Sequence, residues 1–330
     1  MNQITARVSA VHKERYELLT GGGRLFGKLK TGVYHNGGEP YPTTGDFVTV
    51  LENPDGDSVI IKTHPRKSLF VRQDPDPGGY RNQAVAANFD AVFIMQSLNQ
   101  DFNLRRLERY LALAWQSGGT PVVVLTKSDL AGDPAAHFSA AGSVAAGVDI
   151  VAVSAKTGEG LADLAEYLRP GATCVFLGSS GVGKSSLLNA LMGEEVMAVS
   201  AIREDDGKGR HTTTHRQLAA LPNGAYIIDT PGMRELGLWD AMEGLGGLFA
   251  DVEALLGHCR FSDCKHQTEP GCAIRAALEN GELPPKRWER YNKLKREALY
   301  AEDKAAAIRE KSARNKDIAA YSRQRKKEIW

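Results

Sequence analysis

A glycine-rich octapeptide constrains this chain more than any other feature. Residues 178–185 read G-S-S-G-V-G-K-S, which matches the pattern G-x-x-x-x-G-K-[S/T] of phosphate-binding loops. Residues 173–177 before it are apolar, as in a buried strand, and residues 186–192 after it carry apolar side chains three and four positions apart, as in a helix. A strand, a glycine loop and a helix in this order predict a phosphate site.

In such a loop several backbone amides and the helix N-terminus face one anion. Lys184 would add positive charge near the β- and γ-phosphates, and Ser185 is the expected Mg²⁺ ligand. A plain glycine turn is the alternative, although the pattern arises by chance only about once in a hundred chains of this length. We expect a nucleotide to contact the whole loop and the start of the helix: Gly178, Ser179, Ser180, Gly181, Val182, Gly183, Lys184, Ser185 and Ser186.

The composition is that of a globular protein with more than one domain. The chain has 330 residues, of which 42% are hydrophobic and 25% charged. No run approaches the roughly 18 apolar residues that a membrane span needs, and the N-terminus does not have a basic segment followed by an apolar one. We therefore expect a cytoplasmic protein without a membrane partner.

The first part of the chain, residues 1–65, alternates short β-type segments with turns rich in Gly, Pro and Asn. Closely spaced strands of this kind predict a small barrel of the oligonucleotide-binding (OB) type. Its basic residues fit either contact with nucleic acid or an ordinary solvated surface: Lys13, Arg15, Arg24, Lys28 and Lys30. Residues 66–87, which are rich in Pro, Asp and Gly, are interpreted as a linker.

Residues 88–237 are interpreted as an α/β domain. Apolar segments at 90–95, 121–125 and 149–153 are typical of strands, and residues 104–115 follow a helical pattern. Strands that are apolar almost throughout predict a parallel sheet covered on both faces, which is a doubly wound fold.

Two of these strands end in loops that are suited to reading a base. The Asp129 carboxylate could accept hydrogen bonds from N1–H and the 2-amino group of guanine, which adenine does not offer, so this position selects GTP over ATP. The stem of Lys127 could lie along the base, and Ala155 could offer its amide. Thr126 replaces the usual Asn, which weakens one orienting hydrogen bond. The predicted base loops are Thr126, Lys127, Ser128 and Asp129, and Ser154, Ala155 and Lys156.

The order of these motifs is unusual, because the base-reading loops precede the phosphate loop. In this respect the sequence resembles a P-loop GTPase whose motifs are circularly permuted. A nucleotide site can form with either order of the motifs, because all of these loops leave the same edge of a parallel sheet and meet there whatever their order in the chain.

Two segments after the phosphate loop resemble the switch regions of GTPases. Residues 203–215 resemble a switch I loop, in which Thr213, or alternatively Thr212, would contact Mg²⁺ and the γ-phosphate only in the GTP state. A threonine-rich strand entry is the other interpretation. Residues 229–232 read D-T-P-G and would bring Asp229 near the metal and the Gly232 amide to the γ-phosphate.

The residue after this motif is Met233, where Ras-like GTPases carry the glutamine that positions the attacking water. An apolar side chain cannot orient water, so we expect slow intrinsic hydrolysis that needs a partner. His211 is a candidate for positioning the water, although it could equally shape its loop.

Three cysteines and one histidine lie close together in the spacing C-x4-C-x-H-x5-C: Cys259, Cys264, His266 and Cys272. Four ligands of this type form a closed structural Zn²⁺ site, with no position left for water. A disulfide with a spare thiol is the alternative, which is uncommon in a cytoplasmic chain.

The C-terminal segment is basic. Residues 286–330 contain 15 Lys and Arg against 7 Asp and Glu, whereas the whole chain carries a net charge of only +1. A basic helical tail binds phosphate backbones through charge. A solvated helix with a frayed end is the other interpretation.

Taken together in this order, the motifs T-K-x-D, S-A-K, G-x-x-x-x-G-K-S, D-x-P-G and C-x4-C-x-H-x5-C resemble the ribosome small-subunit-dependent GTPase A family. The resemblance implies an OB barrel, a permuted GTPase domain at 88–237 and a zinc-binding, basic helical domain at 238–330. It further implies a monomer that hydrolyses GTP with Mg²⁺, holds one structural Zn²⁺, and acts late in maturation of the 30S subunit and its 16S rRNA. Ribosome-binding factor A is a further implied partner.

Two other functions fit parts of the sequence. One is a permuted GTPase of large-subunit assembly, against which the barrel and the zinc segment argue. The other is an RNA-binding assembly protein that uses GTP only as a structural ligand.

Overall fold

The structure is a computed structural model that describes residues 2–13, 15–35, 38–73, 82–99, 101–195, 217–229 and 246–299. Its internal contacts divide the chain into two compact units. The first, the N-terminal unit, comprises Met1–Arg72 and Gln83–Leu236. The second, the C-terminal unit, comprises Gln73–Asn82 and Gly237–Trp330.

The chain begins with a closed barrel, which confirms the prediction for this region. Strand β1 pairs with both β2 and β4, β3 pairs with β2 and β5, and β4 pairs with β5, so the ring closes. The interior is apolar and includes the fully buried Val8, Leu18, Val48, Val50 and Ile60. The elements are β1 (Gln3–Val11), β2 (Tyr16–Thr20), β3 (Gly23–Leu29), α1 (Thr31–Tyr34), β4 (Phe47–Leu51) and β5 (Ser58–Thr63).

The stretch interpreted as a linker contains two paired strands, β6 (Leu69–Gln73) and β7 (Asn82–Ala87). The ring of Phe70 is buried and stacks on Phe89, with 4.9 Å between the ring centroids. An apolar side chain of β6 therefore packs against a residue just before the strand that begins at Ala91.

The second part of the N-terminal unit is an α/β sheet in the order β10-β9-β8-β11-β13-β12. The strands from β10 to β13 pair in parallel, and β12 adds an antiparallel edge. Every residue of β8 and β11 is buried, as the apolar runs predict. The strands are β8 (Ala91–Ser97), β9 (Thr120–Thr126), β10 (Asp149–Val153), β11 (Thr173–Leu177), β12 (Gln217–Ala220) and β13 (Tyr226–Asp229).

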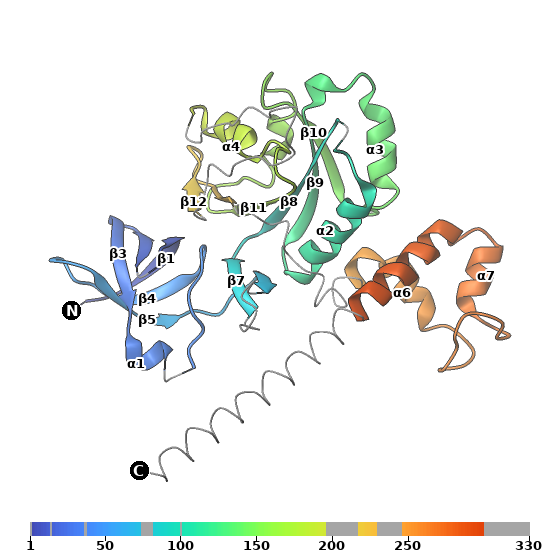
Figure 1. Ribbon diagram of the computed structural model, residues 1–330, viewed down its shortest axis with the longest axis horizontal. Helices are drawn as coiled ribbons and strands as arrows, with labels where there is room; N and C mark the ends of the chain where they lie inside the picture. Colours follow the sequence, from blue (N-terminus) through green and yellow to red (C-terminus); the bar gives the residue numbers. More distant parts are fainter. Residues whose placement is uncertain are drawn as a thin grey trace, which may run out of the picture. The chain divides into compact units, whose positions relative to one another are not determined.

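Helices cover both faces of this sheet (Figure 1). On one face, Leu187 and Leu188 of helix α4 (Lys184–Met192) share a buried cluster with Phe93 and Phe176 of the sheet. The short helix η2 (Ala162–Leu164) contributes Leu164 to the same cluster. On the other face α2 (Leu104–Gln116) contacts β8 and β9, and α3 (Pro134–Gly142) contacts β10. The doubly wound interpretation is thus confirmed.

A buried arginine on the barrel holds the amino ends of the strands that lead into the phosphate loop and the D-x-P-G motif. Arg7 on β1 donates to the hydroxyl of Thr173 at the start of β11, at 2.7 Å. Its guanidinium also lies over the rings of Phe47 and Tyr226, 5.1 and 4.9 Å from their centroids. In addition, Ala10 of β1 pairs with Gln217 of β12. The barrel and the sheet therefore share polar and aromatic contacts within one unit.

The C-terminal unit is helical, with α6 (Ala250–Leu256), α7 (Ala273–Glu279) and a helix at 285–299. Its core contains Phe249, Val252, Ile274 and Tyr291, all of them almost fully buried. The Cys/His segment connects α6 to α7. Among the described residues, no helix combines the length and the apolar character needed to cross a membrane.

Candidate functional site

The phosphate loop connects β11 to α4 at the carboxyl edge of the sheet. Gly181 and Gly183 adopt φ angles of 75° and 106°, a backbone region that favours glycine. The Lys184 ammonium donates to the carbonyls of Gly178 and Ser179 at 2.8 and 2.7 Å. The loop is thus curled around its own lysine at the start of α4, which is the arrangement that could hold an anion.

The first base loop is tied directly to the phosphate loop. Thr126 is buried, and its hydroxyl donates to the carbonyl of Val182 at 2.6 Å. Lys127 has a left-handed φ of 59°, and its ammonium donates to the carbonyl of Gly181 at 2.9 Å. Residues 54 to 56 positions apart in the chain are therefore hydrogen-bonded neighbours.

The second base loop orients the aspartate that the sequence singles out. The hydroxyl of Ser154 donates to Asp129 Oδ1 at 2.7 Å and accepts from the amide of Thr157 at 3.1 Å. Asp129 and Ser128 lie in the short helix η1 (Ser128–Leu130), directly after β9. Ala155 and Lys156 follow β10, the neighbour of β9 at this edge. A carboxylate held in this way can accept donors from a guanine edge.

A buried carboxylate lies at the end of β13. Asp229 is 5% exposed, and within the described part of the chain its Oδ1 has no hydrogen-bond partner. Burial raises the pKa of this carboxyl group, while the charge of Lys184 opposes the shift. An unpartnered, buried carboxylate oxygen close to the phosphate-loop lysine fits a magnesium site, because hard cations prefer oxygen ligands. Three further predicted residues lie outside the described residues: His211, Thr213 and Gly232.

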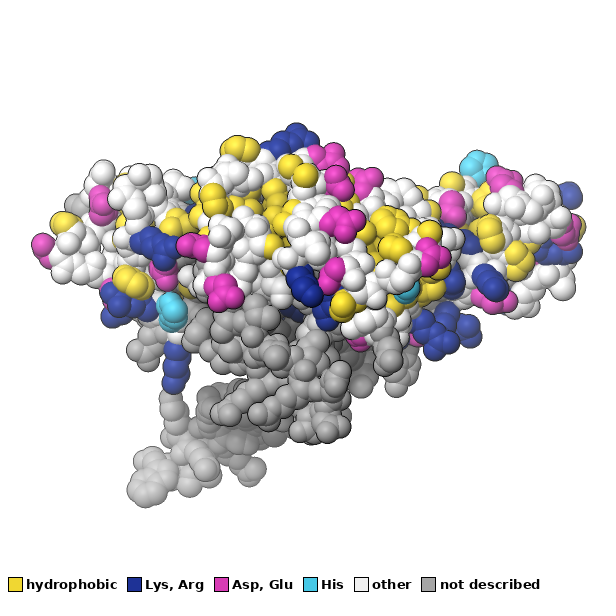
Figure 2. Space-filling view, turned by 90° about the horizontal axis from the view of Figure 1, so that it is seen from above, with side chains coloured by type: hydrophobic (Ala, Val, Ile, Leu, Met, Phe, Trp, Pro, Cys, Tyr) yellow, Lys and Arg dark blue, Asp and Glu magenta, His cyan; other side chains and the backbone are white. Residues whose placement is uncertain are grey.

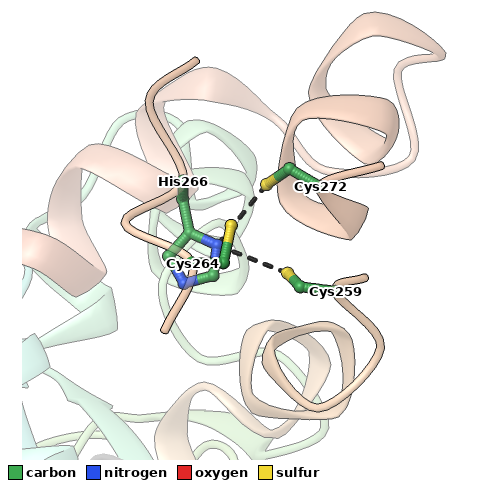
Figure 3. A group of neighbouring side chains, drawn as sticks. All are labelled: Cys259, Cys264, His266 and Cys272. Carbon is green, nitrogen blue, oxygen red and sulfur yellow. Dashed lines mark hydrogen bonds between the residues drawn. The ribbon is translucent and has the colours of Figure 1, made fainter. Parts of the chain in front are cut away.

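The four predicted metal ligands converge on one point (Figure 3). Their ligand atoms all lie within 4.8 Å of one another. The Nδ1 atom of His266 lies 3.5 Å from Cys259 Sγ and 3.4 Å from Cys272 Sγ. All three cysteines are free thiols rather than disulfide partners. Three sulfurs and one imidazole at these separations fit a tetrahedral zinc site.

A carboxylate that the sequence did not single out holds the loop that carries His266. Glu269 accepts hydrogen bonds from the amides of Lys265, Gln267 and Thr268 at 3.1, 2.8 and 3.0 Å. Hydrogen bonds from its own backbone amide and then from these three amides lower the pKa of the Glu269 carboxyl to about 2. They also support the left-handed φ of 60° at His266. The role of Glu269 could not be predicted from a sequence pattern, because its partners are backbone amides.

These features define a class of protein: a circularly permuted P-loop GTPase, with an N-terminal barrel and a Cys₃His cluster. The model of the RsgA GTPase family matches residues 63–239. The chain belongs to this family and is a GTPase.

The comparisons with individual proteins agree. The small ribosomal subunit biogenesis GTPase RsgA 2 of Lactiplantibacillus plantarum is 44% identical over 90% of this chain and 84% of its own. The protein of the same name from Vibrio parahaemolyticus is 44% identical over 98% and 86%. The crystal structure of YjeQ from Thermotoga maritima matches with a TM-score of 0.67 and 29% identity, over 90% of this chain and 99% of that one. YloQ, a circularly permuted GTPase, shares the fold with a TM-score of 0.64.

Proposed function

We propose that this chain hydrolyses GTP as a factor in late maturation of the small ribosomal subunit. The observation that carries the nucleotide part is Asp129, held by Ser154 at the same edge as the phosphate loop. The ribosomal part rests on the relatives, which are named as small ribosomal subunit biogenesis GTPases. In this proposal the protein works in the cytoplasm, as a monomer.

Each part of the site has a proposed role toward GTP. Lys184 and the amides of the loop bind the β- and γ-phosphates, and Asp129 selects guanine. The hydroxyl of Ser185 and the carboxylate of Asp229 would hold the magnesium ion, which neutralises charge on the phosphates when it is bound. Thr213 and the amide of Gly232 would sense the γ-phosphate, and His211 is kept as the candidate for positioning water.

The Cys₃His cluster would hold one zinc ion with Cys259, Cys264, His266 and Cys272. The proposed role is structural, because four protein ligands leave no open position for a substrate. Burial lowers the pKa of His266, which favours the neutral imidazole that a metal requires.

The proposed partners are the 30S subunit and its 16S rRNA, with ribosome-binding factor A as a further candidate. On the barrel Arg15 lies over the half-exposed ring of Phe26, 3.8 Å from its centroid, and such a pair could stack on bases. Several of the basic residues predicted to bind RNA are paired with carboxylates, however. Arg15 and Lys28 both contact Asp57.

The surface charges are likewise mixed in sign. Figure 2 shows Lys and Arg side chains interspersed with Asp and Glu over the visible face. On this face charge does not single out an RNA-binding surface, and in this proposal aromatic stacking on the barrel contributes to recognition.

The test is GTP turnover alone, with purified 30S subunits and with purified 50S subunits. We expect slow turnover that 30S subunits accelerate and 50S subunits do not. Acceleration by 50S subunits alone would support the large-subunit function instead. Acceleration by neither, together with tight GTP binding, would leave GTP as a structural ligand. Lys184→Ala is the control that must abolish nucleotide binding in every case.

A further inference from the structure

One contact on the phosphate loop is not explained by the motifs. The side chain of Ser179 contacts another loop, and its hydroxyl donates to Asp101 Oδ2 at 2.6 Å. Ser179 is only 2% exposed, so its hydroxyl depends on this partner. Asp101 lies 78 residues earlier, in the loop between β8 and α2.

The sheet explains why the two residues meet. Strands β8 and β11 are parallel neighbours, with Leu177 opposite Ile94, so the loops that follow them leave the same edge side by side. The approach is close, because a Cβ at Gly178 would lie 3.0 Å from the carbonyl of Met95. The backbone near the end of β8 therefore packs directly against the first residue of the phosphate loop.

Asp101 is itself held firmly. The Arg106 guanidinium in the first turn of α2 contacts both carboxylate oxygens, Nη1 to Oδ1 at 3.1 Å and Nη2 to Oδ2 at 2.9 Å, and also donates to the Asp101 carbonyl. The backbone of Arg106 is fixed in turn, since its amide donates to the capping side chain of Asn103 at 3.1 Å. The Asn99 side chain accepts from the amide of Asp101 at 3.0 Å.

This arrangement acts on the lysine of the site. Ser179 is held at two points, because its hydroxyl binds Asp101 while its carbonyl accepts from Lys184. The contact with Asp101 and the contact with the Lys184 ammonium therefore meet at one residue. Arg106 balances the negative charge of Asp101, which would otherwise repel a triphosphate at the neighbouring loop.

We infer that Asp101, held by Arg106, is a positioning residue that keeps the phosphate loop in its nucleotide-binding shape through the hydroxyl of Ser179. The inference rests on the proposed binding of GTP at residues 178–185. It assigns the β8–α2 loop a part in nucleotide retention, and it predicts an effect on binding rather than on the hydrolytic step.

The experiment measures the release rates of fluorescent GDP and GTP together with kcat and KM. We expect Ser179→Ala and Asp101→Ala each to release nucleotide about tenfold faster, the size expected for loss of a hydrogen bond to a charged group. KM should rise while kcat stays within about threefold. Ser179→Thr, which keeps the hydroxyl, should restore retention. The double variant should be no worse than Asp101→Ala alone, because both changes remove one contact.

Asp133→Ala is the matched control. Like Asp101, Asp133 is an aspartate in a loop that leads into a helix packed on this sheet. It caps α3 by accepting from the amide of Ala135 at 3.0 Å, and none of its hydrogen bonds within the described residues reaches the phosphate loop. If Asp101 only supports the start of a helix, the Asp101 and Ser179 variants will release nucleotide no faster than Asp133→Ala, which overturns the inference. Additive effects in the double variant would also overturn it.

Lys184→Ala separates this inference from the proposed function. If Lys184→Ala loses nucleotide while the Asp101 and Ser179 variants behave as the wild type, the inference alone fails. If Lys184→Ala binds GTP normally, the proposed function fails and the inference with it. Should Asp101→Ala not fold, as judged by circular dichroism, Ser179→Ala tests the same contact from the other side.

Discussion

The nucleotide site and the Cys₃His cluster are held together in different ways. In the nucleotide site, side chains from distant parts of the chain bind one another directly. Thr126 binds Val182, Lys127 binds Gly181 and Ser154 binds Asp129, all within 2.6 to 2.9 Å. In the cluster, the ligand atoms converge on one another, with His266 Nδ1 3.5 Å from Cys259 Sγ and 3.4 Å from Cys272 Sγ. Side chains of the first site hold one another in place, whereas the ligand atoms of the cluster surround a position that a metal ion could occupy.

The surroundings of the two sites explain the difference. The nucleotide loops rest on strands that are wholly buried, such as β8 and β11. The segment from 257 to 271, which carries most of the cluster, is exposed or half-buried throughout. A segment that buries so little apolar surface cannot offset the entropy lost on ordering it, and metals commonly supply the missing free energy.

Metal removal tests this contrast with the largest expected effect. Binding of a structural zinc ion contributes about 10–16 kcal/mol in small zinc domains. We expect chelation, or Cys264→Ser, to make residues 246–299 sensitive to protease while GTP binding by the N-terminal unit persists. Zinc content by elemental analysis and the masses of the proteolytic fragments give the readout. Protease resistance that survives complete metal loss would contradict the contrast.

The nucleotide side of the contrast is tested by Asp129→Asn. An amide can still accept one hydrogen bond, but it loses the charge that strengthens bonds from N1–H and the 2-amino group. We expect about 3 kcal/mol of lost binding free energy, roughly a hundredfold in GTP affinity. Xanthine carries an oxygen in place of the 2-amino group, so affinity for xanthosine triphosphate should rise. Unchanged GTP affinity by calorimetry would show that Asp129 does not read the base.

The same contrast shows what the sequence could predict. Glycine-rich and Cys/His spacings are local patterns, so the sequence alone predicts both the loop at 178–185 and the Cys₃His cluster. The long apolar runs likewise predicted the parallel strands β8 to β11. By contrast, Arg7 on Thr173 and Asp101 on Ser179 join residues that lie 166 and 78 positions apart. No spacing marks such pairs, because only the strand order brings them together.

At two places the structure adds contacts or elements that the sequence does not reveal. The sequence predicts that Thr126, in place of Asn, weakens one orienting hydrogen bond; the structure adds that its hydroxyl donates to the carbonyl of Val182 at 2.6 Å. The Pro and Gly content of residues 66–87 predicts a linker, and the structure places the strands β6 and β7 in this stretch. A high content of Pro and Gly predicts turns well, but it does not predict whether the apolar residues between the turns form strands.

An ion pair in the described part of the C-terminal unit sharpens the comparison. Arg287 is 8% exposed and binds both oxygens of Asp251 at 2.9 and 3.0 Å. Its guanidinium also lies over the ring of Phe249. In zinc-loaded protein, Asp251→Asn leaves this arginine without its charged partner. Because Asp251 is half-exposed, we expect a loss of only about 1–2 kcal/mol, measured by denaturant unfolding.

The pH dependence of this pair has a defined sign. Burial alone would raise the pKa of Asp251, but hydrogen bonds from Arg287 outweigh it and hold that pKa below its ordinary value. The pair therefore contributes fully above about pH 4, the pKa of an aspartate in an unfolded chain, and its contribution falls as the pH drops below that. The stability difference between the wild type and Asp251→Asn should shrink on acidification. A constant difference would mean that charge is not involved.

The smallest expected effect concerns Thr126, where the two loops of the nucleotide site meet. Thr126→Val keeps the shape of the side chain but removes the donor to the carbonyl of Val182. One neutral hydrogen bond contributes about 1 kcal/mol, so we expect GTP affinity to fall about fivefold. Thr126→Ser retains the hydroxyl and should bind GTP as the wild type does, and nucleotide titration compares the three proteins. Equal affinity in Thr126→Val would mean that the base loop keeps its position without this hydrogen bond, so that Lys127 on Gly181 suffices to join the two loops.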